Sequence, residues 1–200
     1  MTAMCRTDAL PLIFDCEANA AQRKFKQDCL VRAIDYLTAM TDTQTLTLRP
    51  YHDDLAEAFY RINAEWIESM FVMENTDRDI LMNPRERIID AQGDILFVEA
   101  SGLGIVGVCA LLKTGDGAFE LTKMGVLESA RGRKAGEFLL AAMIARAREL
   151  GPRKLYLLTN KKCAAAVHLY EKLGFVHDAA IMRDYGARYD RCDVAMVFPL

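Results

Sequence analysis

Positive charge and glycine are concentrated in one short segment of this chain. Arg131, Arg133 and Lys134 place three cations within four residues, and Gly132 and Gly136 stand among them. A helix that begins here would add its unpaired backbone N–H groups and the positive end of its dipole to those charges. Such crowding is unfavourable unless an anion binds, and glycines beside a helix N-terminus commonly hold a phosphate. The segment is therefore predicted to hold a pyrophosphate group.

Two common nucleotide-binding motifs do not fit the spacing of this segment. A P-loop has the form G-x-x-x-x-G-K-[ST], whereas Gly132 and Gly136 are only four residues apart and are followed by Glu137. A dinucleotide fingerprint has the form G-x-G-x-x-G, which this segment also lacks. The spacing excludes both motifs in this segment. The alternative remains that the segment is a basic surface turn at the start of an unrelated helix.

A strand and a long helix are predicted on either side of the segment. Residues 119–127 are predicted as a strand, and a helix from Lys134 ends at Leu150, where Gly151 and Pro152 follow. Residues 154–158 are predicted as a second strand, of the buried type. A strand, a phosphate loop, a helix and a strand in this order imply a parallel pairing of the two strands.

The segment resembles motif A of the GNAT superfamily, the general amine N-acetyltransferases, in which a Gln/Arg-x-x-Gly-x-Gly/Ala loop joins a strand to a helix. Here that loop is Arg131–Gly136, and Leu139 and Leu140 stand where the family has an apolar pair. Lys134 departs from the pattern because the family usually has a glycine at that position. Its side chain would narrow the approach to a phosphate, although it could add a charge of its own.

A second resemblance lies downstream, to motif B of the same superfamily. The A-x-x-x-Y-x-x-x-G-F ending of that motif matches Ala166, Tyr170, Gly174 and Phe175. Two motifs in the right order are more specific than either alone, so the chain is identified as a member of the superfamily. The resemblance implies an α/β fold for residues 45–200, with a mixed central sheet of about six or seven strands flanked by about four helices.

The resemblance implies direct transfer of an acetyl group from acetyl-CoA, bound as co-substrate, to a primary amine in a ternary complex. An alkyl ammonium of pKa about 10.4 is not nucleophilic, so a base must remove a proton. Glu120 matches the general base of some family members. Because alternate residues of a strand point to the same face, Glu120 is predicted to lie on the same face as Thr122, Met124 and Val126. Its carboxylate would then project from the face that bears the cleft. A solvated strand glutamate is an equal alternative.

The same strand would supply the donor that stabilises charge on the acyl oxygen. In the family this donor is a backbone N–H of the motif A strand, here Met124, Gly125 and Val126, which would also hold the pantetheine arm. Gly125 is predicted to let the backbone bulge toward the ligand. Tyr170 matches the general acid that reprotonates the departing thiolate, and a core tyrosine is the alternative.

The asparagine that many members place seven residues before the tyrosine is replaced here by Cys163. Asn160 is close enough in sequence to take its role. A covalent route through Cys163 is not favoured, because His168 would not face it on a helix. The implied cofactor-binding residues are Met124, Gly125, Val126, Arg131, Gly132, Arg133, Lys134, Ala135, Gly136 and Asn160, and the implied catalytic residues are Glu120 and Tyr170.

A second class of function stays open, in which the domain binds or senses acyl-CoA without turnover. The departures at Lys134 and Cys163 favour it, whereas Tyr170, Glu120 and the arginine of the loop favour catalysis. The acceptor is a small-molecule or peptide amine that the sequence does not identify. Its pocket could be lined by the loop residues Arg183, Asp184, Tyr185, Tyr189 and Asp190, and a solvated charged loop is the alternative.

Composition limits the remaining choices. The 200 residues are 52% hydrophobic with a net charge of −3, which favours one folded domain and argues against a nucleic-acid partner. The six cysteines show no C-x-x-C pair, so neither a metal site nor a disulfide framework is predicted. The absence of a long apolar run predicts a cytoplasmic protein without a membrane partner. A homodimer is an expectation from the resemblance.

The rest of the chain supplies a helical N-terminal extension and the other elements of the domain. Residues 17–40 show the spacing of an amphipathic helix within an N-terminal extension, 1–44, and this helix either contacts a partner or packs on its own domain. Residues 1–39 are predicted to be dispensable for catalysis. The remaining predicted elements are strands at 45–49, 95–99, 105–112, 175–176 and 193–198, and helices at 53–66, 83–91 and 160–173, with 67–81 and 178–192 as connections.

Overall fold

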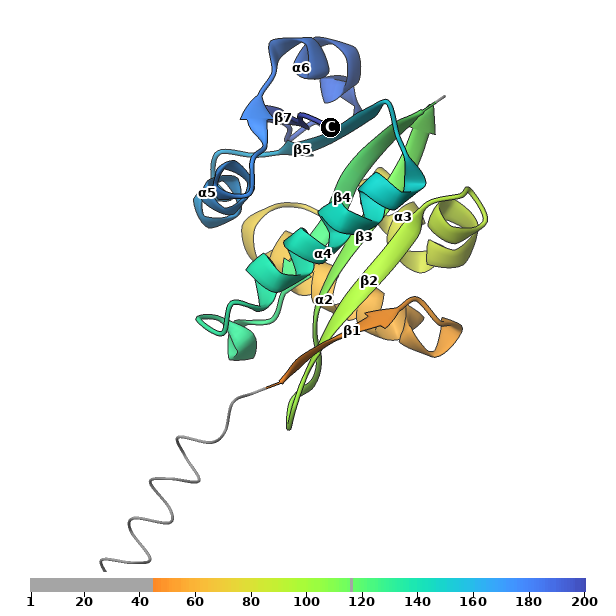
Figure 1. Ribbon diagram of the computed structural model, residues 1–200, viewed down its shortest axis with the longest axis vertical. Coiled ribbons are helices and arrows are strands. Elements are labelled where there is room, and N and C mark those ends of the chain that lie inside the picture. The colour runs from red at the N-terminus through yellow and green to blue at the C-terminus, as the bar shows by residue number, and fades with distance from the viewer. Residues whose placement is uncertain (1–44, 116) are drawn as a thin grey trace, which may run out of the picture. The chain divides into compact units, whose positions relative to one another are not determined.

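The computed structural model describes residues 45–115 and 117–200, so the helix predicted at residues 17–40 and the extension 1–44 lie outside the described residues. One seven-stranded mixed sheet organises the described chain, in the order β1-β2-β3-β4-β5-β7-β6 (Figure 1). Its strands are β1 (Leu46–Pro50), β2 (Asp94–Ala100), β3 (Gly104–Gly115), β4 (Ala118–Val126), β5 (Lys154–Thr159), β6 (Val176–His177) and β7 (Val194–Phe198).

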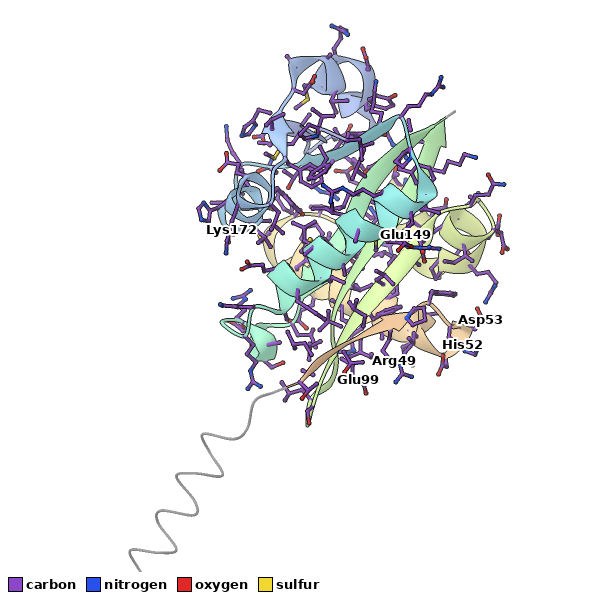
Figure 2. All side chains as sticks on the ribbon, viewed as in Figure 1. Arg49, His52, Asp53, Glu99, Glu149 and Lys172 are labelled. Atoms are coloured by element: carbon purple, nitrogen blue, oxygen red, sulfur yellow. The ribbon has the colours of Figure 1, made fainter. Side chains whose placement is uncertain are left out.

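Neighbouring strands are antiparallel at every position but one. β4 and β5 are parallel, which confirms the pairing predicted for the strands on either side of the basic loop. The edge pair β1 and β2 also carries a cross-strand ion pair, in which Arg49 Nη1 lies 3.1 Å from Glu99 Oε2 (Figure 2). Because both side chains are exposed, this pair contributes little to stability.

Helices cover both faces of the sheet. α4 (Ala135–Leu150) packs Leu139 and Met143 against the face that holds Leu111, whereas α2 (Ala56–Met70) packs Phe59 against the face that holds Ala110. This division follows from the alternation of side chains along β3. The other helices are α3 (Asn75–Met82), α5 (Ala164–Lys172) and α6 (Ala179–Tyr185), with single turns η1 (Asp53–Leu55), η2 (Arg85–Ile89), η3 (Glu128–Ala130) and η4 (Gly186–Arg188).

One extra residue interrupts the pairing of β4 with β3. Thr122 pairs with Ala110, and Gly125 pairs with Val108, so three steps along β4 match two steps along β3. Lys123 lies in this bulge with a φ of 51°, a left-handed conformation that is unusual for a residue other than glycine. A bulge of this kind bends the strand and reverses the alternation of its side chains.

The reversal places the predicted site residues of β4 on different faces. Met124 and Val126 pack against the α4 side of the sheet. Glu120 lies before the bulge, opposite Leu112, whose side chain belongs to the α2 side. The common face predicted for Glu120, Met124 and Val126 is therefore wrong, because simple strand parity does not survive an inserted residue.

Three helical segments differ from the prediction. The connection predicted at 67–81 contains most of α3, which begins with a reciprocal capping box between Glu74 and Asp77. The loop predicted at 178–192 contains α6, because the Asp178 side chain accepts hydrogen bonds from the backbone N–H groups of Ala180 and Ile181. The helix predicted at 83–91 is shortened to the single turn η2.

One glycine run outside the basic loop has the spacing of a dinucleotide fingerprint. Residues 102–107 read G-L-G-I-V-G, and Gly102 and Gly104 have φ values of 76° and 71°. They form the turn between β2 and the antiparallel strand β3, so no helix begins there. Without a helix N-terminus this run lacks the group that binds a pyrophosphate.

Candidate active site

A cleft opens where β4 and β5 separate. The two parallel strands pair only from Ala118 to Glu120 on β4, opposite residues 154–156 on β5, and both continue beyond that point. The opening has a volume of about 670 Å³. It is lined by β4 (121–126), by the loop and first turn of α4 (130–132 and 134–137), by the end of β5 with α5 (158–160, 162–166, 168–170 and 172), and by Trp66, Met70, Phe71, Tyr189, Arg191 and Cys192.

The basic loop lies at one end of this cleft. Gly132 takes a φ of 77° and Lys134, the N-cap of α4, takes a φ of 60°. The family's usual glycine at the position of Lys134 thus has a conformational reason, since this backbone conformation costs a non-glycine residue about 1–2 kcal/mol. No side chain caps the N-terminus of α4, so its first backbone N–H groups are available to an anion.

The cations of the loop differ in their positions. Arg131 and Lys134 line the cleft, and Arg131 also forms an exposed ion pair with Glu128, 2.9 Å between Nη1 and Oε1. Arg133 is exposed and is not among the lining residues, so the structure does not bring it to the cleft. On α4, Glu137 is bound by Lys172 Nζ at 2.7 Å, which lowers the pKa of its carboxyl group; Lys172 is labelled on α5 in Figure 2.

Two glycines that line the cleft are needed for different reasons. A Cβ at Gly136 would lie 3.5 Å from Leu169 and 3.7 Å from Val126, at ordinary contact distances, and would occupy the cleft itself. A Cβ at Gly125 would lie only 2.8 Å from Trp66 Cδ1. Gly125 therefore makes room for α2, and the predicted bulge lies at Lys123 instead.

Glu120 is fully buried and does not line the cleft. Neither carboxylate oxygen has a hydrogen-bond partner within the described residues, and Arg188 Nε lies 3.4 Å from Oε2. Burial raises the pKa of Glu120, and the charges of Arg188 and Lys123 only partly oppose that shift. The alternative of a solvated strand glutamate is wrong, and direct contact with a ligand in the cleft is not available to this side chain as it lies here.

Tyr170 lies in the wall of the cleft, on α5. Its ring packs edge-to-face on Phe175, with centroids 5.9 Å apart, and it is only 7% exposed. Within the described part of the chain its hydroxyl forms no hydrogen bond. Burial raises the pKa of that hydroxyl well above its usual value, so Tyr170 holds its proton at neutral pH. A protonated, unpaired hydroxyl at a cleft wall can donate to a ligand.

Asn160 and Cys163 both line the cleft, at the start of α5. The Asn160 amide donates to the Arg191 carbonyl at 2.6 Å and accepts from the Lys162 backbone N–H at 2.9 Å. Both ends of this amide thus serve to fix the loop. Burial raises the pKa of the Cys163 thiol, so it is not activated as a nucleophile.

Lys123 and Arg191 of the cleft wall belong to a charge network that the sequence did not predict. Asp77 on α3 is fully buried and accepts hydrogen bonds from Lys123 Nζ at 2.8 Å and from Arg191 Nη1 and Nη2 at 2.6 and 2.9 Å. Arg191 Nη1 also lies 2.8 Å from Glu74 Oε1. Burial alone would raise the pKa of Asp77, but Arg191 and Lys123 outweigh it and the pKa is lowered.

Of the five residues predicted to line the acceptor pocket, only Tyr189 lines the cleft, and Arg191 and Cys192 of the same predicted loop line it as well. Lys123 Nζ lies 4.8 Å from the centre of the Tyr189 ring. Arg183, Asp184, Tyr185 and Asp190 are not among the lining residues. The α2 helix contributes the other aromatic wall, where Trp66 and Phe71 pack edge-to-face with centroids 6.5 Å apart.

Together these features define an α/β protein with a cleft between β4 and β5, lined by a basic loop, an uncapped helix N-terminus and an aromatic wall. A model of the acetyltransferase (GNAT) family matches residues 49–175. The chain therefore belongs to the GNAT acetyltransferase family, which confirms the resemblance and the fold predicted from the two motifs.

Relatives and solved structures agree with this assignment. The uncharacterized N-acetyltransferase YjgM of Escherichia coli K12 is 34% identical over 83 residues, which are 42% of this chain and 50% of YjgM, so the chain spans about half the length of this curated relative. A GNAT-family acetyltransferase from Staphylococcus aureus Mu50 has a TM-score of 0.69 at 19% identity, covering 77% of this chain and 98% of that one. A Bacillus subtilis acetyltransferase in complex with CoA has a TM-score of 0.59 at 22% identity, covering 78% and 99%.

No helix among residues 45–115 and 117–200 is long and apolar enough to cross a membrane. No group of three or more His, Cys, Asp or Glu side chains in the same ranges is arranged to hold a metal ion.

Proposed function

We propose that this protein transfers an acetyl group from acetyl-CoA directly to a primary amine, with both substrates bound in the cleft. The separation of β4 and β5 beside the uncapped N-terminus of α4 is the observation that carries this proposal. It offers a long opening with a positive helix end, which suits a pyrophosphate joined to an extended chain. The B. subtilis structure in complex with CoA is a fold neighbour that supports the same ligand class.

Each part of the cleft then has a role in binding. The first turn of α4 would bind the pyrophosphate through its backbone N–H groups, with added charge from Arg131 and Lys134. Gly136 keeps the space beside Val126 open. The backbone of Met124–Val126 would hold the pantetheine arm and stabilise charge on the acyl oxygen. The bound thioester supplies the activated acetyl group.

Proton transfers would fall to two residues. Tyr170 would donate its proton to the departing thiolate, because its hydroxyl is protonated at neutral pH and lies in the cleft wall. Glu120 would accept the proton of the amine only through an intervening hydroxyl, since it does not line the cleft. Thr122 and Tyr189 both line the cleft, and each lowers the pKa of Glu120 although neither forms a hydrogen bond with its carboxylate in this structure. The raised pKa of Cys163 supports direct transfer over a covalent route.

Thermal unfolding with added acetyl-CoA, ATP or NAD tests the ligand class. At a hundredfold excess over its dissociation constant, a ligand that binds only the folded state stabilises it by about 2.7 kcal/mol. We expect acetyl-CoA alone to raise the midpoint and Gly136→Trp, which fills the cleft, to abolish the rise. Gly115→Trp is the matched control, because a side chain there would meet no atom within 4 Å. A rise with ATP or NAD but not with acetyl-CoA would contradict the proposal.

A second candidate function is an acyl-CoA-binding module without turnover. The burial of Glu120 away from the cleft favours it, because the base matched by the resemblance cannot touch an amine directly. Release of free CoA thiol in the presence of mixed amines separates the two functions. Binding of acetyl-CoA without thiol release under any of these conditions would favour the module.

A further inference from the structure

The carboxylates at the cleft are all bound to cations of the protein. Among the described residues, the one acid that lines the cleft is Glu137, and Lys172 holds it at 2.7 Å. Behind the wall, Asp77 and Glu74 are held by Arg191. A polyamine or aminoglycoside acceptor carries further ammonium groups, and these would find no free carboxylate here. The cleft therefore disfavours an acceptor with several positive charges.

Two cations of the cleft wall lie beside Phe71. Lys162 Nζ lies 5.7 Å from the centre of the Phe71 ring, and the Arg191 guanidinium lies 5.6 Å from the same centre. The donors of Arg191 are directed to Asp77 and Glu74. Lys162 lines the cleft and forms no ion pair within the described residues, so its ammonium group is available to a ligand.

Apolar groups lie beside these cations. Trp66, Met70 and Phe71 line the α2 side of the cleft, and Lys162 reaches Phe71 from the loop before α5. A ligand in this part of the cleft would thus meet an aromatic and thioether surface next to one unpaired ammonium. The surrounding positive charge would also lower the pKa of a bound amine, which favours its nucleophilic form.

We propose that the acceptor is an α-amino acid with an apolar side chain, whose carboxylate is bound by Lys162 and whose side chain packs on Trp66, Met70 and Phe71. This inference rests on the proposed acetyltransfer and names its substrate class. The amine nitrogen attacks the acetyl carbonyl carbon and the C–S bond breaks. The nitrogen loses one proton and the departing sulfur gains one, so the products are an N-acetylamino acid and free CoA.

Release of CoA thiol from acetyl-CoA, measured with matched acceptors, tests the proposal. The acceptors are L-leucine, L-methionine and L-phenylalanine, the amide of each, and spermidine. We expect kcat/KM to be at least tenfold higher for one or more of the acids than for its amide, and negligible for spermidine. The amides keep the amine and the side chain, so this ratio reports on the carboxylate alone.

Substitution of Lys162 assigns that preference to its ammonium group. Lys162→Gln should raise KM for the amino acid at least tenfold while KM for acetyl-CoA changes less than twofold, and Lys162→Arg should restore most of the affinity. Lys161→Gln is the matched control: it removes the same charge one residue away, from a lysine that is exposed, paired with Asp193 at 3.6 Å and outside the cleft lining.

If the amides or spermidine react with a higher kcat/KM than the amino acids, the acceptor proposal is wrong and acetyltransfer stands. If Lys162→Gln lowers kcat/KM equally for the acids and their amides, Lys162 does not bind the carboxylate. Absence of thiol release with every acid would also overturn the acceptor proposal. If acetyl-CoA in addition fails to raise the unfolding midpoint, the proposed function is wrong as well.

Discussion

Lys123 Nζ lies 2.8 Å from Asp77 Oδ1, and both side chains are almost fully buried although 46 residues separate them in the chain. Lys123 occupies the bulge of β4, and Asp77 belongs to the capping box of α3. Their ion pair therefore joins the helices of the α2 side to the strand that opens the cleft. Arg191 adds a second cation to the same carboxylate.

Removal of Asp77 should be strongly destabilising. Asp77→Ala leaves Lys123 and Arg191 as buried charges without that carboxylate, so we expect a loss of about 3–5 kcal/mol in the free energy of unfolding. Lys123→Met should cost clearly less, because Asp77 keeps Arg191. Urea unfolding of both variants measures the difference, and equal losses would show that the network does not depend on Asp77.

Glu120→Gln should raise the thermal midpoint at neutral pH. Burial raises the pKa of Glu120 in the folded state above its value in the unfolded chain. The folded protein therefore loses stability as the pH rises through these two pKa values, because ionised Glu120 is less favourable in the folded state. The gain from Glu120→Gln should therefore vanish at a pH below the ordinary glutamate pKa of about 4.3 and increase as the pH rises above it, until the pH exceeds the raised folded-state pKa. A gain that does not change with pH would contradict this explanation.

The same variant tests the relay to the amine. If Glu120 accepts the proton, Glu120→Gln lowers kcat while the folded protein becomes more stable. Unchanged kcat in a stabilised variant would assign the base elsewhere.

Tyr170→Phe should separate catalysis from packing. The hydroxyl forms no hydrogen bond within the described residues, and the ring keeps its contact with Phe175. We expect kcat to fall by about 10²–10⁴ fold, with little change in the unfolding midpoint or in KM for acetyl-CoA. A fall in stability with unchanged kcat would assign Tyr170 to the core alone.

Gly125→Ala and Gly136→Ala should have opposite consequences. The added Cβ at Gly125 meets Trp66 and Ile62 at 2.8–3.1 Å, so we expect a loss of about 1–3 kcal/mol. At Gly136 the nearest atom is 3.5 Å away, and Gly136→Ala should leave stability unchanged or slightly higher while it weakens acetyl-CoA binding. Paired unfolding and binding measurements on the two variants check both effects.

Lys134→Gly should stabilise the protein, because it relieves a φ of 60°. We expect about 0.5–1 kcal/mol, less than the full strain, since glycine also raises the entropy of the unfolded chain. Lys134→Ala removes the same charge and keeps the strain. Equal losses of acetyl-CoA affinity in the two variants would assign the effect to the lysine charge, and a loss confined to Lys134→Ala would contradict that assignment.

The sequence by itself determined the elements whose signals are local. Gly132 and Gly136 beside three cations predicted a loop at the start of α4, and Gly151 marked the end of that helix, because glycine and helix termini have conformational requirements that act within a few residues. The resemblance of residues 166–175 to motif B predicted that Tyr170 lies at the cleft, and its side chain is found in the cleft wall. Arg131 and Lys134 were likewise predicted to be there.

Tertiary structure alone decided the position of Glu120 and the network around Asp77. The bulge at Lys123 depends on the register of β4 against β3, and one inserted residue moves Met124 and Val126 away from the face of Glu120. The pairing of Asp77 with Lys123 and Arg191 joins three distant segments, and each charge taken singly looks like an ordinary surface residue. Contacts of this kind join residues that are far apart in the sequence, so they produce no local pattern of residue types from which they could be predicted.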